Sequence, residues 1–417
     1  MKQHYDIVIM GAGMVGSSFA VAMLDRAKSL DLSIALIEPN ALQTDSSLEN
    51  QQASFDSRAT ALSYGSAIIY QQLSVWDELQ RHVQAIAKIH VSDKGHFGVA
   101  RLSAEQENLA ALGYVVENKW LGDVLYRHLA ESEQAKKLDF CCPASVEKIE
   151  RVDGLMHLQV KYRQTEYQVT TQLVVMADGG RSKLREKLGI SYSETHYQQH
   201  ALVANLAVDR AHQNIAYERF TDTGPIALLP LLTRQRQHRC GLIWTIPEQE
   251  IEQVLGLSDR QFLARLQQRF GYRAGRFIDV GARVSYPLKL QTAQEQVRAG
   301  LVIVGNAAHT LHPIAGQGFN LALRGVVELA QQLVASAQQA QSFGDYNMLY
   351  DYQQSRLADQ RTTIGFSDKS MRLFSTSNPI IALGRDAGLQ FLDICPAAKT
   401  VFSRSAMGLT SPMSLLD

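Results

Sequence analysis

The 417-residue sequence predicts an α/β fold in which a mostly parallel sheet is interleaved with a second, mostly antiparallel sheet and followed by a helical C-terminal region. Three observations lead to this prediction. A strand, a glycine-rich turn and a helix open the chain at residues 5–27, and another strand–loop–helix unit spans residues 301–335. Between them, residues 201–290 contain successive short strand patterns, which are typical of antiparallel pairing. A chain of this length normally divides into two domains.

Composition narrows the classes of protein. The 41 Lys and Arg residues equal the 41 Asp and Glu residues, and zero net charge argues against a nucleic-acid partner. No apolar run reaches about 18 residues, so no transmembrane helix is predicted, and the N-terminus has no signal-peptide pattern. The four cysteines do not have the paired spacing of metal ligands, so no metal site is predicted. The cysteines are Cys141, Cys142, Cys240 and Cys395. A reducing cytoplasm is expected as the compartment.

The first strand–turn–helix unit carries a nucleotide-binding pattern. Tyr5–Met10 predicts a buried strand, the GAGMVG run follows at residues 11–16, and an apolar helical pattern continues to about Ala27. Ile34–Ile37 predicts the next strand, which ends at Glu38. This is the GxGxxG dinucleotide fingerprint between a strand and a helix, so the domain is expected to be Rossmann-like.

Each residue of the fingerprint has a physical role. Gly11 permits the tight turn, Gly13 lets the backbone approach a pyrophosphate, and Gly16 lets the helix pack closely on the strand. Glu38 lies roughly twenty residues further on, where it can bind ribose hydroxyls. An acid there disfavours a 2′-phosphate, so the pattern indicates NAD or FAD rather than NADP.

A late stretch has the same anion-binding character. Leu301–Val304 predicts a short buried strand, a loop follows with Pro313, Gly316 and Gly318, and Phe319–Ala335 predicts a helix. Free N–H groups and the helix dipole favour negative charge at the start of such a helix. An ordinary turn before a surface helix is the alternative.

Two further stretches are candidates for cofactor contact. A buried strand at Leu173–Ala177 runs into Asp178-Gly179, and a helix follows through Leu188; this resembles a second place where the nucleotide is held. Residues 40–57 are polar and predict a loop, after which residues 56–62 are expected to enter a helix. Arg58 then has two interpretations, a surface salt bridge or a position over the cofactor.

The remaining elements complete the predicted order. The middle block is expected to form the wall of a pocket. Its candidate lining residues are Phe220, Leu228, Trp244 and Tyr286, with simple core packing as the alternative. Strands are predicted at His90–Gly98 with a turn, Val115–Glu117, around Val146, at Leu155–Val160 and Tyr167–Thr171 as a hairpin, and at Ala201–Val208, Tyr217–Thr221, Ile226–Pro230, Cys240–Ile246 and Arg283–Leu290. Helices are predicted at Lys119–Glu131, at Pro247–Phe270 as one helix, and from Ala330 to the end.

These motifs together resemble a known family. GxGxxG with Glu38, Asp178-Gly179 and the stretch from Gly305 to Gly318 are similar to the class A flavoprotein aromatic hydroxylases, which have the para-hydroxybenzoate hydroxylase fold. The resemblance covers essentially the whole chain. Within that family, AHTLHPIAGQGFNL at residues 308–321 resembles the ubiquinone-biosynthesis hydroxylases. HVSDKGH at 90–96 and ERFT at 218–221 are most similar to those acting on 2-octaprenyl-6-methoxyphenol.

The resemblance implies a division of the chain and a set of cofactor contacts. Residues 1–75, 113–190 and 296–345 would bind FAD, 76–112 and 191–295 would form the substrate domain, and 346–417 would be C-terminal helices. The implied FAD contacts are Gly11, Gly13, Gly16, Glu38, Arg58, Val146, Asp178, Gly179, Gly305, Asn306, Pro313, Gly316, Gln317, Gly318, Phe319 and Asn320. The chain has Gly305-Asn306 where most of the family has Gly-Asp. In the family that Asp binds the ribityl chain of the cofactor, so an uncharged Asn puts the FAD affinity in question. The hydroxylases of the methoxyphenol share this Asn.

The resemblance also implies a reaction. NAD(P)H would reduce FAD, O₂ would add at flavin C4a, and the hydroperoxide would hydroxylate a polyprenyl phenol, 2-polyprenyl-6-methoxyphenol, in ubiquinone biosynthesis. Pro313 is a candidate for positioning at the flavin; His309 and His312 are weaker proton-relay candidates, with a structural role in the loop as the alternative. No nucleophile–base pair is expected, because the flavin carries the chemistry.

Partners and alternatives follow from the same resemblance. A lipid substrate suggests peripheral contact at the inner face of the membrane, a lipid carrier, or other ubiquinone-biosynthesis proteins. The patches Asn378–Leu392 and Val401–Leu409 suit membrane contact, or packing in a homo-oligomer. Two other functions stay open: a hydroxylase of another aromatic or prenylated ring, and a flavin-bound assembly partner without turnover.

Overall fold

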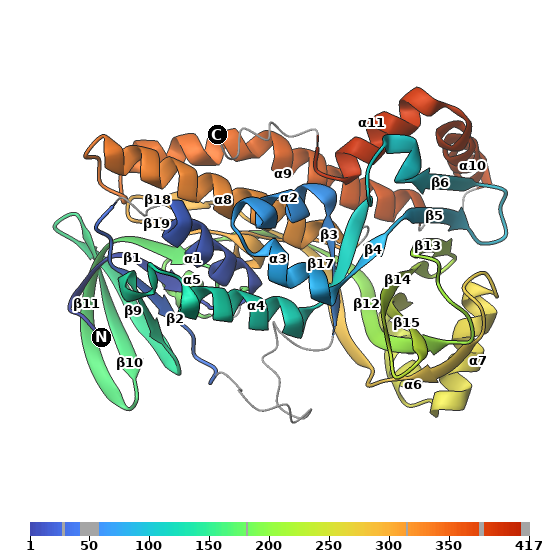
Figure 1. Ribbon diagram of the computed structural model, residues 1–417, viewed down its shortest axis with the longest axis horizontal. Helices are drawn as coiled ribbons and strands as arrows, with labels where there is room; N and C mark the ends of the chain where they lie inside the picture. Colours follow the sequence, from blue (N-terminus) through green and yellow to red (C-terminus); the bar gives the residue numbers. More distant parts are fainter. Residues whose placement is uncertain (27–29, 42–57, 181, 314–315, 375–378, 410–417) are drawn as a thin grey trace.

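The computed structural model describes residues 1–26, 30–41, 58–180, 182–313, 316–374 and 379–409. Several predicted features therefore lie outside the described residues: most of the polar loop at 42–57, the helix end at Ala27, Asn378, and the last residues of the chain. The described strands form three sheets. The long helices α8 (Gln317–Gln338) and α9 (Tyr346–Phe374) run together along one side of the molecule (Figure 1).

The first sheet joins segments that are far apart in the sequence. Among the described residues it has eight strands, in the order β18-β19-β11-β1-β2-β8, with β10 paired to β11 and β9 to β10. β1 lies parallel to β2 and β11, and β11 lies parallel to β19, as expected for strands buried on both faces. The bounds are β1 His4–Met10, β2 Ile34–Ile37, β8 Leu138–Cys141, β9 Ala144–Val152, β10 Leu155–Tyr162, β11 Thr165–Met176, β18 Val297–Arg298 and β19 Leu301–Ile303.

Helices cover this sheet and contribute its core. α1 (Met14–Arg26) and α8 (Gln317–Gln338) bury apolar residues beside β1 and β11 in one continuous cluster that also includes α4 (Asn118–Glu131). Phe19, Met23 and Leu323 are fully or almost fully buried in it. Full burial of such side chains is the main stabilising contribution here.

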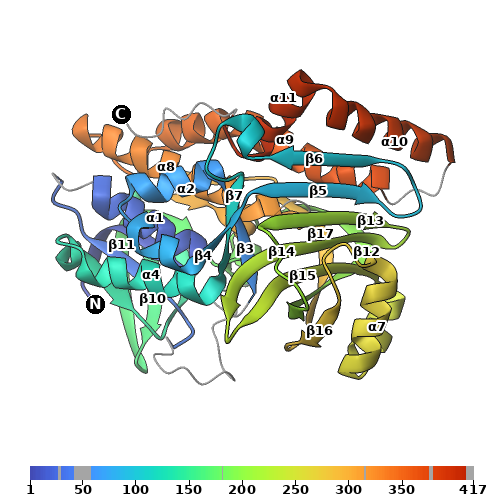
Figure 2. The ribbon, with the colours of Figure 1, turned by 45° about the vertical axis from the view of Figure 1, so that its right-hand side comes forward.

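The second sheet has nine strands among the described residues, in the order β20-β17-β12-β15-β14-β13-β5-β6, with β16 paired to β12. Its pairs are antiparallel except for β13 and β5. Helix α7 (Asp259–Phe270) packs near one face. Helices α10 (Pro379–Ile394) and α11 (Pro396–Ala406) lie at the other side, above β5 and β6 (Figure 2). The bounds are β5 Lys88–Asp93, β6 Val99–Ser103, β12 Tyr192–Val208, β13 Ile215–Thr221, β14 Gly224–Arg234, β15 Gln237–Pro247, β16 Phe277–Val280, β17 Val284–Ala293 and β20 His309–Thr310.

The prediction that residues 56–62 enter a helix is wrong for residues 59–62, which the structure describes as part of a strand. Ala59–Ser63 form strand β3, which pairs antiparallel with β7 (Gly113–Glu117) in a sheet that β4 (Val83–Ile86) completes. Helix α2 (Tyr64–Gln72) begins only afterwards, where the Ser63 side chain accepts a hydrogen bond from the Ser66 N–H. Pairing with a distant strand overrides the local pattern.

The single helix expected at Pro247–Phe270 is also wrong. A short helix α6 (Ile251–Leu255) ends at Gly256, and α7 (Asp259–Phe270) starts anew. Ser258 caps α7, and its N–H donates to Gln261 Oε1 at 3.1 Å in a capping box. The Ser-x-x-Gln signal at 258–261 was present in the sequence and marks this start.

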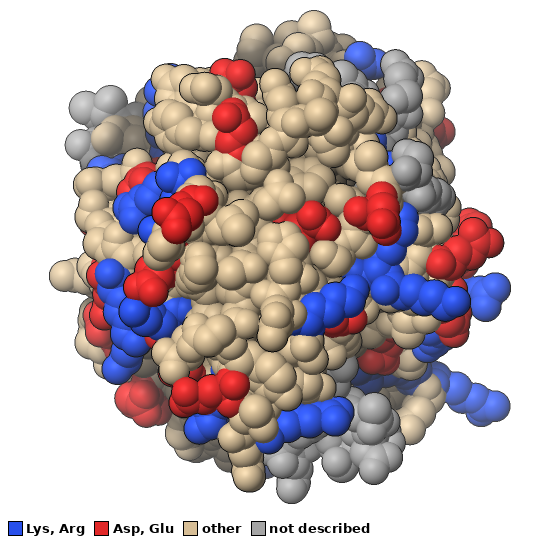
Figure 3. All heavy atoms as spheres, turned by 90° about the vertical axis from the view of Figure 1, so that its left-hand side faces the viewer, with Lys and Arg blue, Asp and Glu red and all other residues tan. Residues whose placement is uncertain are grey.

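Three helices form the described C-terminal region, which confirms the helical prediction there: α9 (Tyr346–Phe374), α10 (Pro379–Ile394) and α11 (Pro396–Ala406). Two short helices complete the order, α3 (Trp76–Leu79) and α5 (Leu184–Lys187). No described helix is long and apolar enough to cross a membrane. On the face drawn in Figure 3, positive and negative side chains are intermixed.

Candidate functional site

A cavity of about 1210 Å³ lies where the first two sheets meet. One end is lined by residues that directly follow parallel strands: Gly11 after β1, Glu38 after β2 and Ala177 after β11. Ligands of open parallel sheets bind at this carboxyl edge. The other end is lined by β5, β13, β14 and β15 and by α9 and α10.

The glycine turn after β1 is shaped for close approach of a ligand. Gly11 has φ +99°, and a Cβ there would lie 2.6 Å from the Ala177 carbonyl oxygen, so only glycine fits. Gly11 and Gly13 line the cavity just before α1 begins, where free N–H groups favour an anion. A Cβ on Gly16 would lie 1.9 Å from the Gly11 carbonyl oxygen. Gly16 does not line the cavity and serves helix–strand packing.

Glu38 is held in place by the turn that it faces. Its side chain is 7% exposed. Oε2 accepts a hydrogen bond from the Ala12 N–H at 2.9 Å, and Oε1 accepts from the backbone N–H and side-chain amide of Asn40 at 3.1 and 3.0 Å. The carboxylate is thus oriented beside the glycine turn, as recognition of ribose hydroxyls beside a pyrophosphate requires.

The late loop lines the middle of the cavity. Asn306, Pro313 and the start of α8 at 316–319 all contribute to the lining. Gly316 precedes the helix with φ +61°, a left-handed conformation that favours glycine. Gly305 also has a positive φ, +65°, but it packs against Val15 and does not line the cavity. Residues 314–315 lie outside the described part of the chain.

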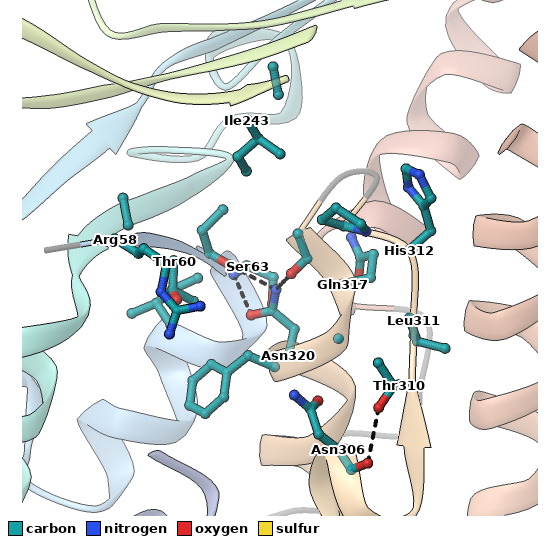
Figure 4. A pocket seen from close by; sticks show the side chains of 18 of the residues that line it. Arg58, Thr60, Ser63, Ile243, Asn306, Thr310, Leu311, His312, Gln317 and Asn320 are labelled. Atoms are coloured by element: carbon teal, nitrogen blue, oxygen red, sulfur yellow. Dashed lines mark hydrogen bonds between the residues drawn. The ribbon is translucent and has the colours of Figure 1, made fainter. Parts of the chain in front are cut away.

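Asn320 ties this loop to the small sheet. Its side-chain oxygen accepts hydrogen bonds from the Ser63 N–H at 2.8 Å and the Ser66 hydroxyl at 2.7 Å. Its amide donates to the carbonyl oxygens of Ala61 at 2.9 Å and Gly316 at 2.8 Å. Figure 4 shows Asn320 beside Ser63. The position of the loop therefore depends on a residue that is 1% exposed.

The other candidate contacts surround the same space. Asp178 accepts hydrogen bonds from the N–H groups of Gly180 and Ser182, both at 3.0 Å, so its carboxylate shapes the turn that contains Gly179. Asp178, Gly179 and Val146 line the nucleotide end of the cavity. Arg58 and Thr60 lie opposite Thr310, Leu311 and His312 in Figure 4. The Arg58 guanidinium is 5.5 Å from the centroid of the Tyr286 ring.

The two loop histidines differ in position. His309 does not line the cavity, and its Nδ1 lies 2.9 Å from the Gly305 carbonyl oxygen. His312 lines the cavity and is 2% exposed. Burial lowers the pKa of His309, and it lowers the pKa of His312 to about 4. Burial thus favours the uncharged form of both rings.

The structure separates the four substrate candidates into two pairs. Phe220 and Tyr286 line the cavity. Leu228 and Trp244 point to the opposite face of the sheet, into the core, where Trp244 packs against Phe262 of α7 with ring centroids 5.8 Å apart. Side chains alternate along a strand, so it is their sequence neighbours that line the cavity. These neighbours are Ala227, Leu229 and Ile243.

Sequence reasoning missed part of the lining. Glu218 of β13 faces the cavity, in phase with Ala216 and Phe220. The alternation of these residues in the sequence was the available signal. The apolar contribution of α9 and α10 had no such signal, because only the fold brings these helices over the sheet. Phe374 of α9 stacks on Phe220 with ring centroids 3.4 Å apart.

Comparison with known proteins agrees with this geometry. A family model described as an FAD binding domain matches residues 4–367. The ubiquinone hydroxylase UbiL of Rhodospirillum rubrum is 33% identical over 97% of this chain and 89% of its own length. The 3-demethoxyubiquinol 3-hydroxylase of Escherichia coli is 29% identical over 98% of this chain and 100% of its own. A crystal structure of p-nitrophenol 4-monooxygenase PnpA from Pseudomonas putida has the same fold, with a TM-score of 0.75 and 14% identity over 99% of this chain and 100% of that one.

Proposed function

The chain belongs to the family of FAD-dependent monooxygenases that includes the hydroxylases of ubiquinone biosynthesis, and from this premise we propose that it hydroxylates the ring of a polyprenyl phenol, 2-polyprenyl-6-methoxyphenol, in that pathway. It is an enzyme that binds FAD and uses NAD(P)H and O₂ as cosubstrates. The identity of the substrate and the position of the ring that is hydroxylated are what we propose.

One observation carries the proposal. The cavity is continuous from the glycine turn and Glu38 to a predominantly apolar end at β5, β13, β14, α9 and α10. Its volume, about 1210 Å³, exceeds the range of roughly 300–1,000 Å³ that is usual for small-ligand pockets. A dinucleotide cofactor and a ring with an apolar tail together suit a space that is polar at one end and apolar at the other.

The residues present fit FAD, and their proposed roles follow from their positions. Gly11, Gly13 and the start of α1 would hold the pyrophosphate, and Glu38 would bind the ribose. Asn306 would offer its side-chain amide to the cofactor without the charge of an Asp.

The remaining lining would hold the reacting ring system. Bound and reduced FAD supplies the oxygen chemistry. Pro313 and residues 316–319 would position the ring system of the flavin, and Phe220 and Tyr286 would border the substrate ring. The apolar walls exclude water, which such oxygen chemistry requires.

We also propose where the lipid tail enters. α10 contributes Ile381 and Leu389 to the cavity lining, and the same helix exposes Leu383 and Ile394 to solvent, at 71% and 77%. Val401 of α11 is 68% exposed. An apolar helix surface beside an apolar cavity suits contact with the inner face of the membrane from the cytoplasm. Sedimentation with phospholipid vesicles tests this: a Leu383→Asp, Ile394→Asp variant should remain in the supernatant.

The experiment that tests the function uses a strain that lacks the gene and is grown in air. Mass spectrometry of its lipid extract should show accumulated polyprenyl methoxyphenol and depleted ubiquinone, and the wild-type gene should restore ubiquinone. Gly11→Ala should fail to restore it, because its Cβ would meet the Ala177 carbonyl.

Gly154→Ala is the matched control. Gly154 also has a positive φ, +85°, but a Cβ there meets nothing within 4 Å and the residue lies in the β9–β10 turn, so this variant should restore ubiquinone. Accumulation of a different prenylated ring would move the assignment to another ring position. Normal ubiquinone in the deletion strain would refute the pathway assignment.

A further inference from the structure

Glu218 is a carboxyl group placed in an apolar part of the cavity. It lies on β13, and the alternation of the strand directs it to the same face as Ala216 and Phe220, which also line the cavity. Its cross-strand neighbours are Val91 of β5 and Ala227 of β14, and both line the cavity. The surrounding walls therefore offer Glu218 no polar partner from the two adjacent strands.

No described residue forms a hydrogen bond or an ion pair with the Glu218 side chain, although two arginines lie on neighbouring segments. Arg219 follows it in sequence but does not line the cavity, and its guanidinium lies 3.4 Å from the Ser92 hydroxyl. Arg385 of α10 does line the cavity, but it is bound to Asp93. Glu218 is thus left for a group that enters the cavity.

The protonation state of Glu218 determines which hydrogen-bonding groups a ligand must carry to pair with it. Burial alone raises the pKa of this carboxyl to about 8, so it is mostly neutral at pH 7. A neutral carboxyl has one O–H donor and retains acceptor capacity. Glu218 is half-buried and faces the cavity, so a ligand that fills the cavity would remove its carboxyl from water. A polar group removed from water without a partner costs free energy, and a ligand that supplies both an acceptor and a donor offsets this cost. A phenolic hydroxyl has this pair of functions, whereas its methyl ether lacks the donor.

We propose that Glu218 binds the phenolic hydroxyl of the substrate ring and thereby selects a free phenol over its ether. The inference rests on the proposed function, since it requires a phenol as substrate. In this role Glu218 touches the substrate and orients its ring within the apolar part of the cavity. A site built to hydrogen-bond a hydroxyl discriminates strongly against an analogue without it, because its own polar group is then left unpaired.

The test measures this discrimination in the FAD-loaded enzyme. Two ligands are compared, a short-chain 2-prenyl-6-methoxyphenol and its phenolic methyl ether. Their dissociation constants are obtained from the perturbation of the flavin absorbance, without NAD(P)H. The wild type should bind the phenol about 10- to 100-fold more tightly than the ether. Glu218→Leu should reduce this preference to about threefold or less, whereas Glu218→Gln, whose amide keeps a donor and an acceptor, should retain most of it.

A matched control distinguishes the loss of a polar contact at Glu218 from a general disturbance of the cavity wall. Val91→Ala alters the same wall across the strand pair and removes only apolar contact. It should weaken both ligands equally and leave the preference unchanged. A Glu218→Leu variant that keeps the wild-type preference would overturn the role of Glu218 and leave the proposed function intact. A wild type that binds and hydroxylates neither ligand nor any polyprenyl phenol would overturn both.

Discussion

Replacing Asn320 by alanine should loosen the join between the late loop and the small sheet. The side chain makes four hydrogen bonds, to Ser63, Ser66, Ala61 and Gly316, at 2.7–2.9 Å. A buried hydrogen bond contributes about 1 kcal/mol net. Loss of all four, with buried partners left unpaired, should lower the free energy of unfolding by about 3–5 kcal/mol.

Asn118→Ala is the matched control for this change. Asn118 is also buried and lines the cavity, but its side chain accepts one hydrogen bond, from the Thr60 hydroxyl at 2.6 Å. Its loss should cost about 1 kcal/mol. Urea denaturation followed by tryptophan fluorescence, on FAD-free protein, measures both values.

The same pair of variants tests whether Asn320 acts through the loop. Because Asn320 holds the Gly316 carbonyl at the start of α8, its loss should also weaken FAD binding, by about tenfold or more. Recovery of flavin fluorescence on dilution reports the dissociation constant. Equal losses of stability in the Asn320→Ala and Asn118→Ala variants, with unchanged FAD affinity, would refute the reasoning.

Four further outcomes are expected. Glu38→Ala should weaken FAD binding by about 10- to 100-fold, as a lost charged hydrogen bond costs about 1.5–3 kcal/mol, and an unchanged dissociation constant would contradict its ribose role. Gly16→Ala should yield little folded protein by circular dichroism, because its Cβ would lie 1.9 Å from a carbonyl oxygen; a wild-type melting curve would show that the turn can shift. Arg324→Met should cost about 1.5–3 kcal/mol in urea denaturation, because Asp359 loses a charged hydrogen-bond partner at 2.9 Å and keeps only Arg356 among the arginines paired with it; a loss below about 0.5 kcal/mol would argue against this. The pKa of Glu218 rises on folding from 4.5 to about 8, so its stabilising contribution is complete below pH 4.5 and is lost as the pH rises through 8. The melting temperature of Glu218→Gln should therefore fall less than that of the wild type over this range, and parallel curves would contradict the assignment.

The nucleotide end of the cavity could be predicted from the sequence because its chemistry is local. A strand, a turn that needs Gly11, a helix and an acid after the next strand are all consecutive in the chain. The late loop is local in the same way, and Pro313 and Gly316 line the cavity as the pattern suggested. The division into six segments and the individual FAD contacts stay predictions.

Other features depend on pairing between distant segments, which no local pattern encodes. Residues 59–63 form a strand because β7 lies beside them. Leu228 and Trp244 are core residues, and their sequence neighbours line the cavity, because the alternation of a strand does not say which face is covered by α7.

The sequence by itself indicated that this chain binds a dinucleotide, because the strand, the glycine turn, the helix and the acid after the next strand follow one another in the chain. The tertiary structure decided which other residues line the cavity beside the dinucleotide site. It brought α9 and α10 over the second sheet and engaged Arg385 with Asp93. It left Glu218 facing an apolar space, with no hydrogen-bond or ion-pair partner in the part of the chain that the structure describes. The physical reason is that burial and pairing of a charge are properties of its neighbours in space, and these come from strands and helices far apart in the chain.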